Sequence, residues 1–257
     1  MKIRLLSDLH LEGRQGYSHK QHQWSTPDGE DVLVLAGDIA VGPMQVQLAI
    51  EYFKRQGFPE IIYVPGNHEL YHHSREDFES LKVHARRAGA HVLDANEVVK
   101  IGGVSFFGGT LWTSFKDGDH LVRATASRNI NDFRVINGWH VNDAQEEYQR
   151  TIEFIKTVHR QTEGKKVIVT HFLPAQACVA ERYKSDKVEM LLNFYFANRL
   201  DDYISTLGED TVWLFGHTHD AMDFKIGDTR LVSNPLGYAR EEIPDFARFD
   251  PFKIIEV

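Results

Sequence analysis

Short apolar runs, each followed directly by polar residues, recur along the first third of the chain. The runs at 2–7, 32–36 and 61–64 have the length and composition of buried β-strands. The segments 44–55 and 76–88 instead carry apolar residues at helical spacing. Strands that alternate with helices predict βαβ units and a largely parallel sheet.

The middle of the chain is richer in short strands. Strands are predicted at 91–94, 97–101 and 104–108, and Gly102-Gly103 between the last two favours a hairpin. A second sheet, or an extension of the first, therefore begins here. A long amphipathic helix is predicted over 142–162. The remaining predicted strands lie at 167–170, 212–216, 222–226, 230–233 and 252–257.

The composition is that of a soluble globular protein. The chain has 257 residues and contains no Pro/Ser-rich linker, repeat or low-complexity run, so a single domain over 1–257 is expected. Hydrophobic residues make up 42% and charged residues 26%, which argues against disordered and fibrous classes. The formal net charge of -8 argues against an extended nucleic-acid surface but still allows a short nucleotide as ligand.

Targeting signals and cysteine usage favour the cytoplasm. The apolar run after Met1 is too short for the core of a signal peptide, and no stretch approaches the ~20 apolar residues of a membrane helix. The single Cys178 cannot form an intramolecular disulfide and is expected to be a structural thiol. We therefore expect a cytoplasmic protein without membrane contact. The sequence itself indicates no oligomeric state.

Five short polar motifs stand directly after predicted strands. They are Asp8-Leu9-His10, Gly37-Asp38, Gly66-Asn67-His68-Glu69, His171 and Gly216-His217-Thr218-His219. The carboxyl ends of parallel strands meet at one edge of a sheet, so the motifs gather seven potential metal ligands: Asp8, His10, Asp38, Asn67, His171, His217 and His219. Carboxylate and imidazole without thiolate favour manganese, iron or zinc. A two-metal hydrolytic site is predicted.

The chemistry of such a site sets conditions on these residues. Two divalent ions repel each other strongly, so a shared carboxylate is needed, and Asp38 is the candidate bridge. Side chains two apart, such as His217 and His219, point to opposite faces of an extended strand. They converge only if the backbone turns, and Gly37, Gly66 and Gly216 are expected to permit tight turns.

The charge balance of the predicted site favours phosphate. Two carboxylates do not cancel two divalent ions, so the pocket should attract an oxyanion, with metal-bound hydroxide as the nucleophile. His68 completes neither metal shell and is a candidate for protonating the leaving group. Glu69 would orient His68 or a ligand histidine.

In this order the motifs resemble those of the calcineurin-like metallophosphoesterase superfamily, which are D-x-H, G-D, G-N-H-[DE], H and G-H-x-H. The resemblance covers nearly the whole chain. It implies an α/β fold, a four-layer αββα sandwich of two mixed β-sheets flanked by helices. It also implies that His68 is catalytic, that one metal is held by Asp8, His10, Asp38 and His219, and that the other is held by Asp38, Asn67, His171 and His217.

The sequence departs from the Ser/Thr phosphatase branch of this superfamily. That branch follows the second motif with Asp-Arg-Gly, whereas Gly37-Asp38 is followed here by Ile39-Ala40-Val41-Gly42, so the phosphate-clamping arginine is missing. The chain also lacks room for the large capping domains of the nucleases and nucleotidases. A small stand-alone phosphoesterase that acts on a small phosphodiester or nucleotide-like substrate is therefore the leading hypothesis.

Two alternatives stay open at this point. A phosphomonoesterase or pyrophosphate hydrolase would use the same ligands. A non-catalytic scaffold that retains the fold would belong to a different class. Such a scaffold is expected to lose ligands or the catalytic histidine, and this chain has all of them.

Four further residues are candidates for contact with the substrate. His72 would line the pocket mouth, with a solvated loop as the alternative. Arg128 and Arg134 lie in a segment of weak periodicity and would grip phosphate oxygens, unless they belong to a capped turn with solvated arginines. Tyr238, in a predicted turn, would stack on a ring of the substrate.

Overall fold

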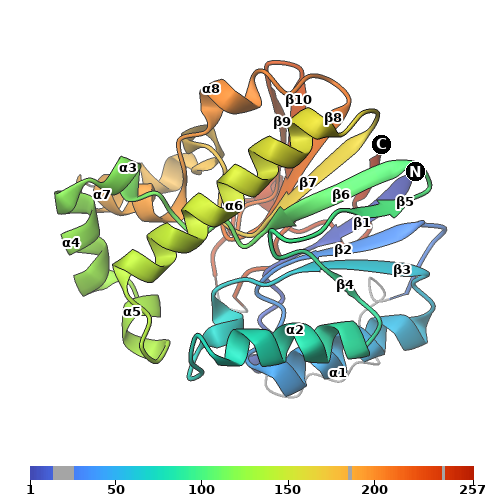
Figure 1. Cartoon of the computed structure of the whole chain (residues 1–257), viewed down its shortest axis with the longest axis horizontal. Helices are drawn as coiled ribbons and strands as arrows, with labels where there is room; N and C mark the ends of the chain where they lie inside the picture. Colours follow the sequence, from blue (N-terminus) through green and yellow to red (C-terminus); the bar gives the residue numbers. More distant parts are fainter. Residues whose placement is uncertain (14–25, 185–186, 239–240) are drawn as a thin grey trace.

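Two β-sheets pack face to face, and helices cover both outer faces (Figure 1). The structure is a computed structural model that describes residues 1–13, 26–184, 187–238 and 241–257. The strand order is β11-β1-β2-β3-β4 in the first sheet and β5-β6-β7-β8-β10-β9 in the second. These four layers confirm the predicted αββα sandwich of two mixed sheets.

The first sheet is parallel except at one edge. Strand β11 pairs antiparallel with β1, and the other neighbours pair in parallel. The strands are β1 (Lys2–Leu6), β2 (Val32–Ala36), β3 (Glu60–Val64), β4 (His91–Val92) and β11 (Ile254–Glu256). The two chain ends therefore lie side by side in this sheet (Figure 1).

The second sheet has antiparallel strands at both edges. Strand β5 pairs antiparallel with β6, β9 pairs antiparallel with β10, and the inner strands are parallel. The strands are β5 (Val99–Ile101), β6 (Val104–Gly109), β7 (Lys166–Thr170), β8 (Thr211–Phe215), β9 (Met222–Ile226) and β10 (Thr229–Ser233). The predicted hairpin at Gly102-Gly103 thus opens a second sheet and does not extend the first.

The inner strands are buried on both faces, which explains their continuous apolar runs. In β2, Val32 and Val34 pack into the core between the sheets, whereas Leu33 and Leu35 pack on the helix side. In β7 the same alternation places Val169 between the sheets. A parallel strand covered on both sides needs apolar residues at every position.

Long helices cover the outer faces of the sandwich. Helices α1 (Pro43–Gln56) and α2 (Asp77–Arg87) lie against the first sheet, and α6 (Val141–Gln161) crosses the second (Figure 1). Ile50 and Phe53 of α1 are buried at helical spacing against the first sheet. All three helices match predicted segments within a few residues.

Several short helices lie to one side of the second sheet and were not predicted. They are α3 (Phe115–Gly118), α4 (His120–Asn129), α5 (Asp132–Val135), α7 (Lys187–Phe196) and α8 (Asp201–Ile204). Helices of this length make too few turns to give a clear periodic signal. The start of α4 is nevertheless marked by Asp119, whose carboxylate accepts the N–H groups of Leu121 and Val122 at 2.9 and 3.1 Å.

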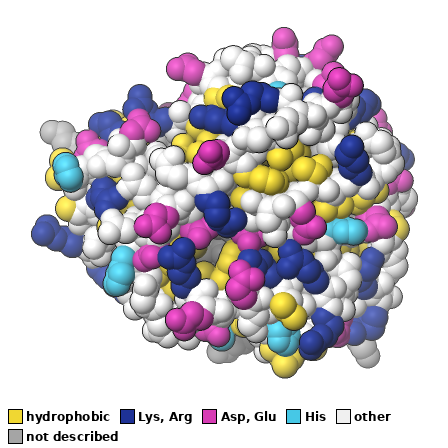
Figure 2. All heavy atoms as spheres, viewed as in Figure 1, with side chains coloured by type: hydrophobic (Ala, Val, Ile, Leu, Met, Phe, Trp, Pro, Cys, Tyr) yellow, Lys and Arg dark blue, Asp and Glu magenta, His cyan; other side chains and the backbone are white. Residues whose placement is uncertain are grey.

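Within the described residues, no helix combines the length and the apolar character that crossing a membrane requires. On the face shown in Figure 2, Lys and Arg side chains are interspersed with Asp and Glu. Side chains of one charge therefore do not form a large patch on that face.

Candidate active site

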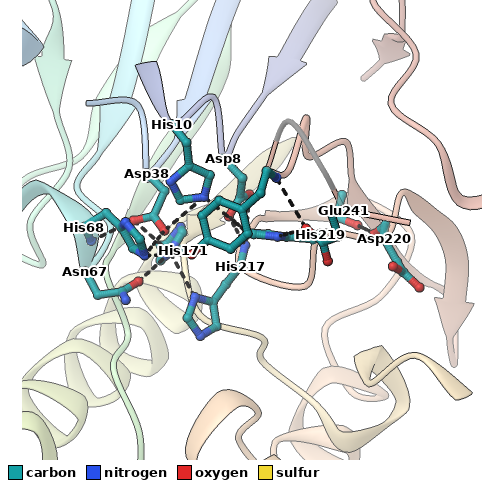
Figure 3. A network of polar contacts seen from close by, with 12 residues as sticks. Asp8, His10, Asp38, Asn67, His68, His171, His217, His219, Asp220 and Glu241 are labelled. Atoms are coloured by element: carbon teal, nitrogen blue, oxygen red, sulfur yellow. Dashed lines mark hydrogen bonds and ion pairs between the residues drawn. The ribbon is translucent and has the colours of Figure 1, made fainter. Parts of the chain in front are cut away.

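The predicted ligands converge beyond the carboxyl ends of five strands, β1, β2, β3, β7 and β8 (Figure 3). Three groups of three donor residues can be distinguished. Inside each group, the ligand atoms all lie within 4.8 Å of one another. The groups are Asp8-His10-His219, His10-Asp38-His68 and Asp38-His171-His217. Asn67 joins the third group, because its Oδ1 lies 3.0 Å from Nε2 of His171. All seven predicted ligands are thus brought together.

The backbone at these ligands is left-handed, which is uncommon outside glycine. Positive φ values of 44° to 68° occur at Asp8, His10, Asp38, His217 and His219. A single left-handed residue at a strand end breaks the alternation of side-chain directions, so residues two apart can point to the same place. Such conformations cost free energy and cluster at functional sites. The turn required by the D-x-H and H-x-H spacings is therefore present.

The three motif glycines serve two different purposes. Gly37 has φ +85° and permits a turn, as expected. Gly66 and Gly216 lack a positive φ, but a Cβ at Gly66 would lie 2.1 Å from Oδ1 of Asp38. At Gly216 a Cβ would lie 2.8 Å from Oδ2 of Asp8. The expected tight turn is wrong for these two glycines, which instead leave room for close neighbours: Asp38 beside Gly66, and both the carbonyl of Ala36 and Asp8 beside Gly216.

The first half of the site is built on Asp8, His10 and His219. Nε2 of His219 lies 3.4 Å from Oδ1 of Asp8 and 3.2 Å from Nε2 of His10. The outer nitrogens of both rings face carboxylates. Nδ1 of His10 lies 3.3 Å from Glu12, and Nδ1 of His219 lies 2.5 Å from Glu241. Such outer partners fix the ring so that Nε2 points inward, which is typical of metal-binding histidines.

The second half is built on Asp38, Asn67, His171 and His217. Nε2 of His171 lies 3.3 Å from Oδ1 of Asp38 and 3.1 Å from Nδ1 of His217. Nδ1 of His171 donates to the carbonyl of Ala36 at 2.9 Å, so Nε2 is the nitrogen that faces the site and that the neutral ring would offer to a cation.

The electrostatics of the second half are those of a cation site. Burial would raise the pKa of Asp38, but the imidazoles of His171 and His68 outweigh it and hold that pKa well below its usual range. Burial lowers the pKa of His171, yet Asp38 and Asp8 raise it to about 9. Burial and the neighbouring His171 together lower the pKa of His217 well below its usual value. Asp38 is therefore an anion around which positive charge is favoured.

The donor set fits divalent cations. Two imidazole–imidazole contacts, of 3.2 and 3.1 Å, turn ring nitrogens toward each other beside buried carboxylates. Asp38 is the carboxylate between the two halves, because its Oδ1 faces His171 and its Oδ2 faces His10.

His68 lies at the edge of this site, in the short 3₁₀ helix His68–Leu70. Its Nδ1 lies 3.5 Å from Glu12, and its Nε2 lies 3.1 Å from the hydroxyl of Tyr238. Its ring stacks on Tyr71 with centroids 4.0 Å apart. Burial lowers the pKa of His68, but the carboxylates of Asp38 and Glu12 raise it more, so the net shift is upward.

Glu69 has a different role from the one expected. It does not orient His68 or a ligand histidine. Its carboxylate accepts the N–H groups of Asp38, Ile39 and Gly66 at 3.1, 3.0 and 2.9 Å, and the hydroxyl of Tyr63 at 3.1 Å. Glu69 therefore ties together the two loops that carry Asp38 and Asn67.

Asp132 is a buried residue of the site that the sequence analysis did not single out. Its Oδ1 accepts the amide of Asn67 at 3.0 Å and the hydroxyl of Tyr71 at 2.7 Å. Its Oδ2 accepts the hydroxyl of Tyr195. The sequence pattern of 128–134 predicts that its arginines contact the substrate. In the structure, its aspartate is the residue that contacts a candidate metal ligand, Asn67.

Glu12 and Glu241 were also missed. Glu12 follows His10 by two residues, in the short helix Leu11–Gly13, so a D-x-H-x-E pattern could have pointed to it. Glu241 contacts His219 from a distant loop. Nothing in the local sequence around Glu241 indicates that contact.

A cavity of about 430 Å³ opens beside the donors. Of the four residues predicted to contact substrate, Tyr238 lines it, with 49% of its surface exposed. His72, Arg128 and Arg134 are exposed and do not belong to its lining. Arg134 instead donates to the carbonyl of Arg128. The same segment reaches the cavity through residues 129–132.

Comparisons with known proteins agree with this geometry. A family model described as calcineurin-like phosphoesterase matches residues 1–221. Uncharacterized protein L509 of Acanthamoeba polyphaga mimivirus is 28% identical over 282 aligned positions, which cover 99% of this chain and 96% of that protein.

Two solved structures show the same fold. Phosphopantetheinyl Hydrolase (PptH) from Mycobacterium tuberculosis superposes with a TM-score of 0.69 at 18% identity, over 93% of this chain and 90% of that one. TT1561 of Thermus thermophilus superposes with a TM-score of 0.53 at 13% identity, over 91% and 88%. Since the family model matches most of the sequence, the chain belongs to the calcineurin-like phosphoesterases, which are metal-dependent hydrolases of phosphoric esters.

Proposed function

We propose that the protein hydrolyses a small phosphodiester or nucleotide-like substrate with the help of two divalent metal ions. The observation that carries this proposal is the position of Asp38, whose two oxygens face the two halves of the site: Oδ1 lies 3.3 Å from Nε2 of His171 and Oδ2 lies 3.8 Å from Nε2 of His10. A carboxylate shared between two groups of nitrogen and oxygen donors is what a pair of adjacent cations requires.

The ligand assignment follows the two halves of the site. One ion would be held by Asp8, His10, Asp38 and His219, and the other by Asp38, Asn67, His171 and His217. Manganese, iron and zinc all suit oxygen and imidazole donors. Two bound divalent ions supply an activated water and neutralise charge on the phosphoryl group.

His68 is the proposed proton donor to the leaving-group oxygen. Its Nδ1 faces Glu12, which leaves Nε2 toward the cavity beside Asp38 and Tyr238. The carboxylates around it favour the charged ring, which is the form that can give up a proton. Tyr71, stacked on the ring, holds it in this orientation.

The composition of the cavity lining supports a diester as the proposed substrate. Among the described residues its lining contains no Lys or Arg. A monoester is largely a dianion at neutral pH, whereas a diester carries one negative charge. A site without a cationic clamp offers less to the additional charge of the monoester.

The test compares bis(p-nitrophenyl) phosphate with p-nitrophenyl phosphate. Protein stripped of metal by a chelator is assayed alone and after addition of manganese, iron or zinc. We expect metal-dependent turnover with a higher kcat/KM for the diester. Preference for the monoester would support the phosphatase alternative and contradict the diester assignment.

Metal stoichiometry separates an inactive enzyme from a scaffold. Elemental analysis of the reconstituted protein should give two ions per chain. A protein that binds no metal and turns over neither ester would contradict the proposed function.

A further inference from the structure

One side of the cavity is apolar and comes from the segment between β7 and α8. This apolar wall consists of Leu173, Val179, Ala180, Tyr183, Leu192 and Phe196. The proposed mechanism gives none of these residues a role as metal ligand or proton donor, and the hydroxyl of Tyr183 is directed to Glu241. The wall therefore requires its own explanation.

The apolar wall begins next to a metal ligand. The ring of Phe196 lies 5.4 Å from that of His217, measured between centroids. Phe172, directly before Leu173, stacks on the same imidazole at 4.2 Å. A group attached to a phosphate at the metal centre would thus meet apolar surface without crossing solvent.

The apolar wall is held in a fixed shape. Asn193 is buried, and its amide donates to the carbonyl of Tyr183 at 2.8 Å, which joins α7 to the preceding turn. The hydroxyl of Tyr183 donates to Glu241, the partner of His219. The wall and the metal ligands are therefore positioned relative to each other before substrate arrives.

The charges along the cavity oppose a second anionic group. Besides Asp38, whose charge the proposed metal ions would neutralise, two carboxylates line it, those of Asp132 and Glu241. Arg182 stands close by, but its guanidinium binds Asp220 at 2.5 Å and Glu241 at 3.0 Å. Beyond the metal centre, the described lining presents histidine as its one basic residue type.

We propose that the apolar wall is a specificity subsite for an uncharged, largely apolar organic group joined to the reacting phosphate. This inference rests on the proposed function and narrows its substrate class to esters with a single phosphate. The cavity volume of about 430 Å³ is within the range of sites for small organic ligands and is generous for a phosphate alone. A pyrophosphate would bring a second charge to a surface that does not neutralise it.

The test uses p-nitrophenyl phosphodiesters that share one leaving group and differ in the second substituent, which is methyl, phenyl or 4-carboxyphenyl. The chemistry at phosphorus is then monitored through the same product. We expect kcat/KM for the phenyl ester to exceed that of the methyl ester about tenfold or more, because apolar contacts discriminate on this scale. The 4-carboxyphenyl ester should lose most of this gain.

A matched pair of variants on α7 locates the effect. Leu192→Asp places a charge in the apolar wall and should lower the phenyl-to-methyl ratio of kcat/KM about tenfold. Met190→Asp makes a similar change on the same helix at a side chain that is 52% exposed and outside the cavity lining. The ratio should not change in Met190→Asp. If Leu192→Asp does not fold, as judged by circular dichroism, Leu192→Ala should lower the ratio in the same direction.

The outcomes separate the two proposals. Equal kcat/KM for the methyl and phenyl esters in the native protein would overturn the subsite and leave the phosphodiesterase intact. The same ratio in Leu192→Asp and Met190→Asp would also overturn it. Absence of turnover for all three esters, with manganese bound, would instead overturn the proposed function.

Discussion

The metal side of the cavity and its apolar wall are built in different ways. On the side of the proposed metal site, here called the metal side, candidate ligands such as Asp38 and His217 follow a strand directly, in left-handed backbone conformations. The apolar wall comes from short helices and turns between residues 173 and 196. Strand ends fix the position of the reacting groups, whereas the wall depends on packing between distant segments. Changes on the metal side should therefore affect the rate or the metal content, and changes in the wall should affect the choice of substrate.

The largest effect is expected for Asp38→Asn. The amide removes the shared negative charge between the two donor groups while it keeps the shape of the side chain. Loss of metal-based charge stabilisation worth several kcal/mol should lower kcat/KM by about 10³-fold or more. Steady-state assays with manganese, together with elemental analysis, measure both the rate and the metal content.

One result would contradict this account of Asp38, and a second measurement separates it from unfolding. Full activity with two bound ions would exclude it as the bridging ligand. Loss of activity through unfolding would be revealed by a lower melting temperature in the absence of metal. Asp117→Asn, at a residue outside the cavity lining, is the matched control and should behave like the native protein.

His68→Ala should separate proton transfer from metal binding. Removal of a general acid typically lowers kcat by about 10²- to 10⁴-fold. Since His68 completes neither proposed metal shell, the protein should keep two ions per chain. An ester with a leaving group of low pKa should lose less rate than one with a poor leaving group, because it needs less protonation. Equal losses for both esters would argue against His68 as the proton donor.

The sequence predicted that the candidate metal ligands converge because the information for this is local. Each motif stands next to an apolar run, and the rule that parallel strands end at one edge then brings the ligands together. The spacing of His217 and His219 even required a backbone turn, which the structure shows as positive φ. At these positions the hydrophobic pattern of the strands and the donor chemistry of the motif residues both indicate that the side chains converge.

The remainder of the site was not predictable because its contacts join distant segments. Asp132 reaches Asn67 across 65 positions of the chain, and Glu241 reaches His219 from a separate loop. Helices α4 and α7 are short, with ten residues each, and the periodicity of such elements is weak. An exposed arginine such as Arg128 attracts attention in a sequence, but its exposure depends on the packing of α4.

Asp132→Asn tests whether one of these long-range contacts sets a metal ligand. A carboxylate only accepts hydrogen bonds, so Asn67 must direct its NH₂ to Asp132 and its Oδ1 to the site. An asparagine at 132 can donate, which allows the Asn67 amide to flip and to present NH₂ to the metal. Removal of such supporting contacts typically costs about 10- to 100-fold in metal affinity.

Calorimetric titration of manganese into the metal-free variant measures this effect. Tyr71→Phe is the matched control, because it removes another hydrogen bond to Asp132 but keeps the bond from Asn67. Metal affinity should fall in Asp132→Asn and change little in Tyr71→Phe. Equal affinity in Asp132→Asn and the native protein would show that the carboxylate does not orient Asn67.

The smallest effect is expected for Arg128→Ala and Arg134→Ala, which test the phosphate grip that their position in the sequence suggested. Both side chains are exposed and outside the cavity lining. Exposed substitutions of this kind shift free energies by about 0.5 kcal/mol or less, so kcat/KM should stay within about twofold. A loss of tenfold or more that is shared by the methyl and phenyl esters would place these guanidiniums on the phosphate after all. In that case residues 128–134 would have to close over the cavity when substrate binds, and the substrate contacts would no longer divide between the proposed metal site and the apolar wall.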